Sequence, residues 1–319
     1  MEAKNNNRTN PSSELSTGNG PLKDKYIDPF TDFGFKKLFG EEGNKELLLD
    51  FLNELLHREE GKIVSITYLK TERFGSSEES RKAVFDLYCE NEKGEKFIVE
   101  LQKSKQEFFK DRTLYYSTFA ITDQAVPGRE WNYQLKEVYV IGILNFVIEE
   151  NKHNIDKYRY DVMLTELETK DIFYEKLKYV YLEMPKFNKE VDELETHFEK
   201  WMYVIKNLDR LDHIPDRLRD RIFQQFFAAA EIAKLTKEEY KAYIDSLNSY
   251  RDYYNTLNYA KEEGRAEGKA EGKEEGRAEG RAEGRAEGRA EGRAEGEEER
   301  SKLQQRIAEL EQQIKRQTE

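Results

Sequence analysis

The chain has almost none of the residues that form disulfides, zinc sites or membrane spans. Its single cysteine, Cys89, excludes an internal disulfide and is expected inside a strand, and its four histidines lie scattered without zinc-ligand spacing. No run of 18 apolar residues occurs. We also find no phosphate-binding glycine loop, no dinucleotide fingerprint and no Ser-His-Asp pattern. We therefore expect a soluble, cytoplasmic protein with no membrane partner.

Positive charge is also scarce for a protein that would bind nucleic acid. Lysine and arginine number 53 against 65 aspartates and glutamates, which gives a formal net charge of -12 at pH 7. Non-specific DNA binders normally carry excess positive charge, because neutralisation of phosphates drives their affinity. A local basic groove is compatible with an acidic protein. If DNA is the partner, we expect weak or transient binding.

The composition indicates that part of the chain is not globular. Charged residues make up 37% of it, hydrophobic residues another 37%, and the mean hydropathy is -0.94. The first residues are rich in Asn, Ser, Thr, Gly and Lys and lack the apolar core of a signal peptide. We expect a disordered leader at 1–24, an α/β domain at 25–187, a helical region at 188–260, a tetrapeptide repeat at 261–300 and a short coiled coil at 301–319.

Two apolar strands near residue 90 each contain an acidic residue. The intervening loop reads as a three-residue hairpin, with Gly94 supplying the left-handed conformation that closes such turns. If Asn91 and Glu95 flank this loop, Asp86 stands directly opposite Glu100. Like charges at opposed positions destabilise a sheet. The hairpin is therefore expected to place two carboxylates against each other on one face.

A divalent cation would remove the conflict between these two acids. Alternation puts Gln102 on the same face as Glu100. A hard cation such as Mg²⁺ takes oxygen ligands, often only one or two protein carboxylates together with water and substrate phosphate. The alternative is that the pairing arises by chance, since acids make up 65 of 319 residues. The placement of both acids within apolar strands supports the metal site, but pattern and spacing by themselves leave the chance pairing favoured.

Three segments resemble a known family: DPFTDFGFKKLFG at 28–40, VFDLYCENEKGEKFIVELQ at 84–102 and FFKDRTLYYS at 108–117. Their order, Asp, hairpin, Glu-x-Gln and then a helix with Phe-x-x-Arg, resembles the PD-(D/E)xK nuclease superfamily, specifically its recombination-promoting nuclease (Rpn) and transposase-like branch. Later landmarks, LKEVYVIGILNF and YLEMPKF, extend the resemblance to about residues 25–260. It implies an α/β restriction-endonuclease-like core, with a mixed central sheet flanked by helices. It also implies a DNA endonuclease that uses Mg²⁺, with Mn²⁺ as an alternative.

The resemblance also implies roles for the residues of the hairpin. Asp86 and Glu100 match the metal-binding acids, and Gln102 stands where the superfamily usually has Lys. A Gln cannot supply positive charge to a scissile phosphate, so we assign it to orienting water. Lys103 follows on the strand, but alternation points it to the opposite face. Lys105, just beyond the strand, is the candidate that would curl back to the substrate.

Further candidates lie on two helices. Asp32 matches the acid of the family's first helix and is a candidate metal ligand, although Thr and Asp at a helix start also act as caps. Lys36 and Arg112 are expected to face substrate, since Arg forks onto phosphate oxygens. Tyr115 is expected in the core, because aromatic residues at helical spacing usually pack there.

The tail has glycine at every fourth position from 264 to 296. Such a period drifts by about 40° per repeat on a helix, and it places like charges at i and i+4. Each glycine also costs about 1 kcal/mol of helix stability relative to Ala. A lone helix should therefore be marginal, which leaves a flexible spacer or a helix supported by a partner chain. The heptad seam that follows favours a homo-oligomer; it comprises Leu303, Ile307, Leu310 and Ile314.

Two functions are compatible with these patterns. The first is a Mg²⁺-dependent DNA endonuclease in which Asp86 and Glu100 hold the metal and Gln102 orients the attacking water. The second is a catalytically weak interaction or regulatory protein that keeps the nuclease fold and oligomerises through its tail. Intact acids favour the first, whereas Gln102 and the acidic net charge favour the second.

Overall fold

A computed structural model describes residues 24–56, 61–73, 83–125 and 132–318. Apart from Asp24, the leader expected at 1–24 lies outside these described residues. The chain divides into two compact units, Met1–Ser249 and Tyr250–Glu319.

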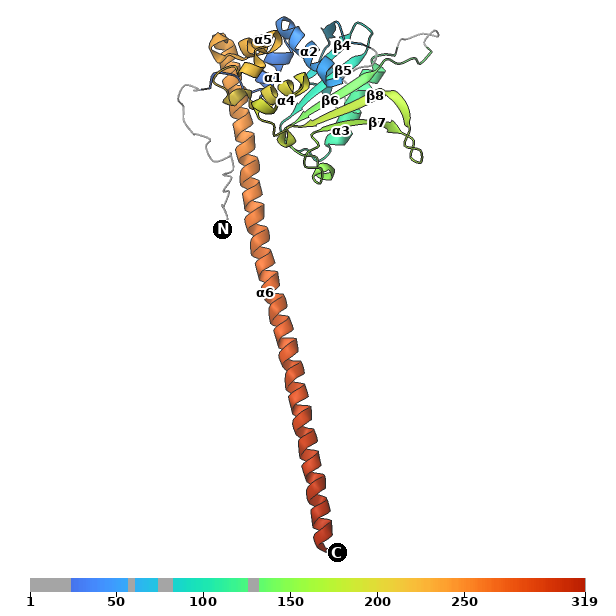
Figure 1. The fold of residues 1–319 in the computed structure, drawn as a ribbon, viewed down its shortest axis with the longest axis vertical. Helices are drawn as coiled ribbons and strands as arrows, with labels where there is room; N and C mark the ends of the chain where they lie inside the picture. The colour runs from blue at the N-terminus through green and yellow to red at the C-terminus, as the bar shows by residue number, and fades with distance from the viewer. Residues whose placement is uncertain (1–23, 57–60, 74–82, 126–131, 319) are drawn as a thin grey trace. The chain divides into compact units, whose positions relative to one another are not determined.

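The first unit is built on a mixed six-stranded sheet of order β1-β4-β5-β6-β8-β7 (Figure 1). The three central strands β5, β6 and β8 run parallel, and the other neighbours pair antiparallel. The expected α/β core with a mixed central sheet is therefore confirmed. Its strands are β1 (Ile66–Tyr68), β4 (Leu87–Asn91), β5 (Lys96–Gln102), β6 (Val138–Leu144), β7 (Arg159–Thr165) and β8 (Ile172–Glu183). A separate ribbon pairs β2 (Glu72–Arg73) with β3 (Ala83–Val84).

Strand β6 is the centre of the sheet. All seven of its residues are buried, as expected for a continuous apolar run with parallel neighbours on both sides. Strand β4 is also largely buried, and Cys89 within it is fully buried, which confirms its expected place in a strand.

Helix α3 (Phe109–Thr122) packs on one face of the sheet. Phe109, Tyr116 and Ala120 join a core cluster there with Tyr88 and Ile98 of the hairpin. This face therefore carries both the helix that follows the hairpin and the hairpin side chains that point toward it.

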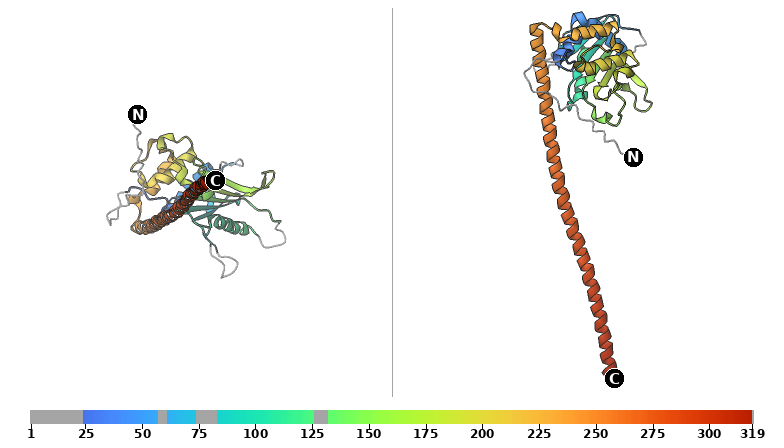
Figure 2. Two further views of the ribbon diagram at one scale, coloured as in Figure 1. Left: turned by 90° about the horizontal axis from the view of Figure 1, so that it is seen from below. Right: turned by 60° about the vertical axis from the view of Figure 1, so that its left-hand side comes forward.

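Four other helices gather beside the sheet (Figure 2): α1 (Asp32–Phe39), α2 (Lys45–Leu56), α4 (His197–Asn207) and α5 (Arg221–Ala230). Their aromatic side chains form a core of their own. Ring contacts join Phe39, Phe51, Trp201 and Phe226 across all four helices. Short 3₁₀ turns connect the elements, namely η2 (Glu42–Asn44), η3 (Glu149–Asn151), η4 (Met184–Lys186), η5 (Val191–Glu193), η6 (Leu208–Arg210), η7 (Asp216–Leu218) and η8 (Ile232–Lys234).

Helix α6 (Lys237–Thr318) begins in the first unit, where Tyr243 and Leu247 are buried. The hydroxyl of Tyr243 accepts a hydrogen bond from Asp28 N at 3.0 Å. These contacts tie the start of α6 to the chain just before α1.

The glycine repeat is helical in the structure, within the long uninterrupted span of α6 (Figure 1). Within the described part of the repeat, no ion pair joins its Arg and Glu side chains, because opposite charges fall two residues apart on opposite sides of the helix. Of the heptad seam, Leu303, Ile307 and Leu310 are exposed, and the side chain of Ile314 lies outside the described residues. No helix among the described residues is both long enough and apolar enough to cross a membrane.

Candidate active site

The β4–β5 hairpin has the predicted register. Leu87 pairs with Val99, Glu90 pairs with Lys96, and Gly94 closes the loop with φ of 81°. The hairpin loop and its left-handed glycine are therefore confirmed. One step beyond Leu87 and Val99, this register brings Asp86 and Glu100 together.

The two acids contact each other's strand directly. Asp86 N donates to Glu100 Oε1 at 3.1 Å, and Leu101 N donates to Asp86 Oδ2 at 2.7 Å. Each carboxylate is therefore held by a backbone N–H of the opposite strand. Glu100 lies on the interior strand β5, whereas Asp86 lies in the bend just before β4, one residue short of the strand in which the sequence placed it.

Burial perturbs both acids. The side chain of Glu100 is 1% exposed, and its pKa is raised to about 8, mainly by burial and then by the charge of Asp86. The pKa of Asp86 is also raised, mainly by burial, and the charge of Asp32 raises it further. The buried Glu100 and the partly buried Asp86 therefore favour a proton or a cation shared between them.

The donor set fits a hard divalent cation. Asp86 and Glu100 supply carboxylate oxygens on one face, which are the ligands that Mg²⁺ and Mn²⁺ accept. Among the described residues, no three His, Cys, Asp or Glu side chains gather into a complete metal cage. A two-carboxylate site is enough for Mg²⁺, because water and substrate phosphate fill its other positions.

Gln102 lies on the same face as Glu100, as alternation predicts. It is 6% exposed, and its Nε2 donates to Glu100 Oε2 at 3.2 Å. That bond leaves the amide oxygen of Gln102 to accept from a water. The side chain is thus attached to the acidic pair itself.

Arg112 of α3 also reaches the acidic pair. Its Nη2 lies 3.3 Å from Glu100 Oε2, and its Nε donates to Tyr116 Oη at 2.9 Å. The guanidinium is about one-third exposed and packs over the Tyr116 ring, 4.9 Å from its centroid. It lowers the pKa of Glu100 and supplies positive charge at the solvent edge of the site.

Thr31, not Asp32, caps the N-terminus of α1, since its Oγ1 accepts from Gly34 N at 2.9 Å. The carboxylate of Asp32 instead forms an exposed ion pair with Lys36 at 2.9 Å. Asp32 does not join Asp86 and Glu100 in a three-acid cluster, but its charge acts on Asp86. Asp32 and Lys36 therefore stand at the margin of the acidic pair.

Lys105 and Lys103 differ from expectation. Lys105 is exposed and forms an ion pair with Glu149 of η3, so it does not turn toward the acidic pair. Lys103 is half-buried, which lowers its pKa, while the charges of Asp32 and Asp86 oppose that shift. Sequence alternation assigned Lys103 to the opposite face. However, β5 ends at Gln102, so the alternation does not extend to Lys103.

The prediction that Tyr115 lies in the core is wrong. Its side chain is 41% exposed, whereas Tyr116 beside it is 8% exposed. Consecutive residues of a helix point about 100° apart, so Tyr115 faces away from the sheet when Tyr116 faces it. The contact between α3 and the sheet uses Phe109, Thr113 and Tyr116.

Comparison with known protein families now identifies the chain's relationships. The family model described as PD-(D/E)XK nuclease family transposase matches residues 29–260. The chain belongs to this family. Its members share a nuclease-type function, and PD-(D/E)XK nucleases generally use divalent metal ions. The matched span includes α1, the hairpin, α3 and the start of α6, so it covers every site residue described above. No curated protein and no solved structure matched the chain.

Proposed function

We propose that the protein is a Mg²⁺-dependent DNA endonuclease of the recombination-promoting type. The observation that carries this proposal is the facing pair of the partly buried Asp86 and the buried Glu100, in a chain that belongs to the PD-(D/E)XK nuclease family transposases. Two acids that face each other in this way lower the stability of a fold, and acids with perturbed pKa values cluster at functional sites, which supports a ligand at this pair.

Each site residue then has a distinct task. Asp86 and Glu100 would hold the cation. When bound, the cation would polarise the scissile phosphate and lower the pKa of a water. Gln102, fixed to Glu100, orients the attacking water with its amide oxygen. Lys103 supplies the positive charge that Gln102 lacks.

Arg112 and Lys36 provide the surface positive charge beside the acidic pair. When a DNA phosphate enters there, Arg112 would leave Glu100 and Lys36 would leave Asp32, and both side chains would bind the phosphate oxygens instead. Because the chain as a whole carries -12, we propose transient rather than tight DNA binding. We also propose that the protein acts in the cytoplasm and that its tail joins copies of the chain into a homo-oligomer.

The deciding experiment is cleavage of supercoiled plasmid by full-length protein with Mg²⁺, with Mn²⁺ and with EDTA. We expect nicking with either metal and none with EDTA. Asp86→Asn should abolish nicking, because the amide removes a charge while its oxygen still accepts from Leu101 N. The matched control is Asp111→Asn, the same change at an exposed position in the first turn of α3, which should cleave normally.

A second candidate function rests on Gln102 in place of the usual Lys. In that case the fold would serve as a catalytically weak interaction or regulatory module that oligomerises through α6. If the parent protein and Asp86→Asn nick plasmid at the same rate, the result supports this second function and rejects the endonuclease.

A further inference from the structure

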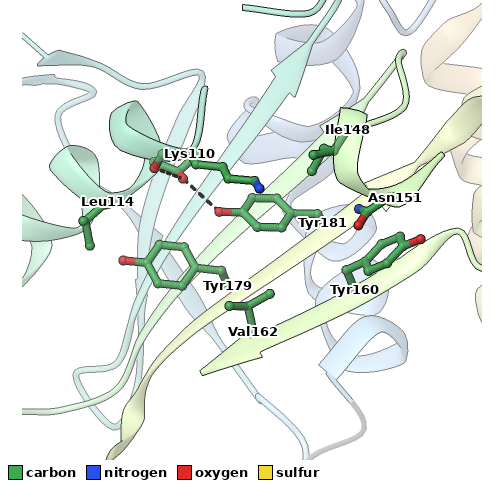
Figure 3. A pocket seen from close by; sticks show the side chains of 9 residues that line it. Lys110, Leu114, Ile148, Asn151, Tyr160, Val162, Tyr179 and Tyr181 are labelled. Atoms are coloured by element: carbon green, nitrogen blue, oxygen red, sulfur yellow. Dashed lines mark hydrogen bonds between the residues drawn. The ribbon is translucent and has the colours of Figure 1, made fainter. Parts of the chain in front are cut away.

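A cavity of about 300 Å³ opens on the same sheet face as the acidic pair, beyond α3 (Figure 3). It lies between α3, strands β7 and β8, and the turn at η3. Its apolar and aromatic walls come from Leu114, Tyr160, Val162, Tyr179 and Tyr181, with Lys110 at one side. None of these residues takes part in the site described above.

The aromatic walls are held in place. The rings of Tyr179 and Tyr181 lie nearly parallel, at 23° with centroids 6.3 Å apart. Their hydroxyls bond Ser117 Oγ at 2.9 Å and Thr113 Oγ1 at 2.8 Å, both on α3. Because each hydroxyl is anchored to the helix, the rings keep a fixed orientation beside the cavity. Figure 3 shows the side chain of Lys110 extending across the Tyr181 ring toward Ile148.

The cavity and the acidic pair lie on one line across the sheet. Glu100 pairs with Gly142, Gly142 with Tyr181, and Tyr181 with Tyr160. Paired residues project from the same face, and strands lie about 4.8 Å apart. Tyr181 is therefore about 10 Å from Glu100 along the row, and Tyr160 about 14 Å.

Gly142 is the position on that row that lets α3 approach. A Cβ at Gly142 would lie 3.3 Å from Phe109 Cζ and 3.0 Å from Tyr181 Cδ1. The Phe109 ring therefore sits over Gly142, in an edge contact with Tyr181 at 5.6 Å. The first turn of α3 thus separates the acidic pair, with Arg112, from the cavity, with Lys110.

The shape and chemistry of the cavity match a nucleobase. Its volume is at the lower end of the range for ligand pockets, which is about 300 to 1,000 Å³. The half-buried Tyr160 ring beside apolar side chains suits the stacking of an unpaired base, whereas Tyr179 and Tyr181 are only 8% and 6% exposed. Lys110 at the rim is paired with Glu150 at 2.8 Å, so a phosphate there would compete with that carboxylate for the ammonium. Successive nucleotides in a stacked strand are about 3.4 Å apart, so the row spans a few nucleotides.

We propose that this cavity binds an unpaired base of the DNA strand whose phosphate lies at Asp86 and Glu100. The inference rests on the proposed function for its substrate. The protein then engages DNA that is single-stranded or locally unpaired a few nucleotides from the point of cleavage. A fully paired duplex leaves the cavity empty and binds more weakly.

Fluorescence anisotropy in Ca²⁺, a hard cation that also takes carboxylate and phosphate oxygens, tests binding separately from the plasmid assay. The probes are a short fluorescein-labelled single-stranded oligodeoxynucleotide and its matched duplex, titrated with full-length protein. We expect tighter binding of the single strand. Tyr160→Ala should weaken it about tenfold, since one stacked base is worth about 1 to 3 kcal/mol. The control Phe173→Ala changes a ring on β8 that is 79% exposed and does not line the cavity, so it should bind as the parent does.

A second variant guards against a folding defect in Tyr160→Ala, since the Tyr160 hydroxyl accepts from Lys186 Nζ at 3.1 Å. Val162→Trp fills the cavity from a side chain that is 45% exposed and removes no hydrogen bond. It should also weaken single-strand binding while leaving duplex binding unchanged. Equal binding of the single strand by the parent and Val162→Trp, or no preference for the single strand over the duplex, overturns the proposal.

The anisotropy result and the plasmid assay are independent. Loss of single-strand preference in Val162→Trp supports the cavity even if the plasmid is never nicked, in which case only the proposed cleavage fails. Conversely, if the parent nicks plasmid in a metal-dependent way and Val162→Trp binds the single strand as the parent does, the endonuclease proposal stands and the base-binding role of the cavity is rejected.

Discussion

The carboxylates of Asp86 and Glu100 each accept a hydrogen bond from a backbone N–H of the facing segment. Asp86 N donates to Glu100 Oε1 at 3.1 Å, and Leu101 N donates to Asp86 Oδ2 at 2.7 Å. The backbone thus holds the two carboxylates on one face of the sheet, where their like charges repel each other. Such an arrangement lowers stability unless a proton or a cation reduces the repulsion, and it is the basis on which we propose a cation site here.

Replacement of Glu100 by Gln should therefore stabilise the fold while it abolishes cleavage. The buried carboxyl has its pKa raised from 4.5 to about 8, so stability is lost as the pH rises from about 4.5 through 8. We expect the free energy of unfolding at pH 8 to rise by about 1 to 3 kcal/mol, measured by urea denaturation without metal. Glu107→Gln, at an exposed position, is the control. A less stable Glu100→Gln protein would contradict this account.

Gln102 should tolerate the residue usual in the wider superfamily. Gln102→Ala removes the group bonded to Glu100 and should lower the initial nicking rate about tenfold. Gln102→Lys should keep or raise the rate, because an ammonium there adds positive charge next to the acids. A folded but inactive Gln102→Lys protein, checked by circular dichroism, would argue against the water-orienting role.

Lys103 should matter more for cleavage than Lys105. Its charge interacts with Asp32 and Asp86, whereas Lys105 is paired with Glu149. We expect Lys103→Met to reduce nicking about a hundredfold and Lys105→Met to reduce it little. Both changes remove the same charge from neighbouring positions, so each is the other's control in one plasmid assay. If Lys105→Met reduces nicking more than Lys103→Met does, Lys105 rather than Lys103 supplies the positive charge for cleavage.

Asp28 should make stability depend on pH. Burial raises its pKa to about 7, with a further contribution from the charge of Asp209. The folded state therefore favours the protonated form. The stability that it gains is fully present below about pH 4 and is lost as the pH rises through 7. Asp28→Asn should remove this loss, which is at most about 4 kcal/mol, because Asn still offers Oδ1 to Phe30 N.

The measurement for Asp28 is urea denaturation of parent and variant at pH 5 and pH 8. The parent should lose more stability than Asp28→Asn between these two values. Parallel pH dependence in the two proteins would show that another group is responsible.

Truncation after Ala260 should leave a folded core with unchanged intrinsic cleavage. The anchor residues Tyr243 and Leu247 remain, and everything removed is exposed in the structure where its side chains are described. A lone helix with nine glycines, and with no ion pair between the Arg and Glu side chains of its repeat, is marginal, so we expect the tail to be paired with a second copy. Light scattering should give a larger molar mass, in chain equivalents, for the full-length protein. Equal oligomeric states would leave the tail as a spacer.

The sequence alone determined the hairpin and its acids, because strand alternation and turn chemistry are local. A left-handed Gly94 fixes the loop, the loop fixes the register, and the register brings Asp86 to Glu100. Gln102 follows from the same alternation. The buried strand β6 was predictable for a similar reason, since a continuous apolar run is typical of a strand with parallel neighbours.

Only the tertiary structure decided the surroundings of that hairpin. Lys103 lies past the end of β5, where alternation no longer holds, and Tyr115 turns outward because the contacts of α3 with the sheet set the rotation of that helix. The row from Glu100 through Gly142 and Tyr181 to Tyr160 joins residues that are up to 81 positions apart in the chain. Parallel pairing of β5, β6 and β8 brings these residues together, and no local pattern encodes which strands become neighbours.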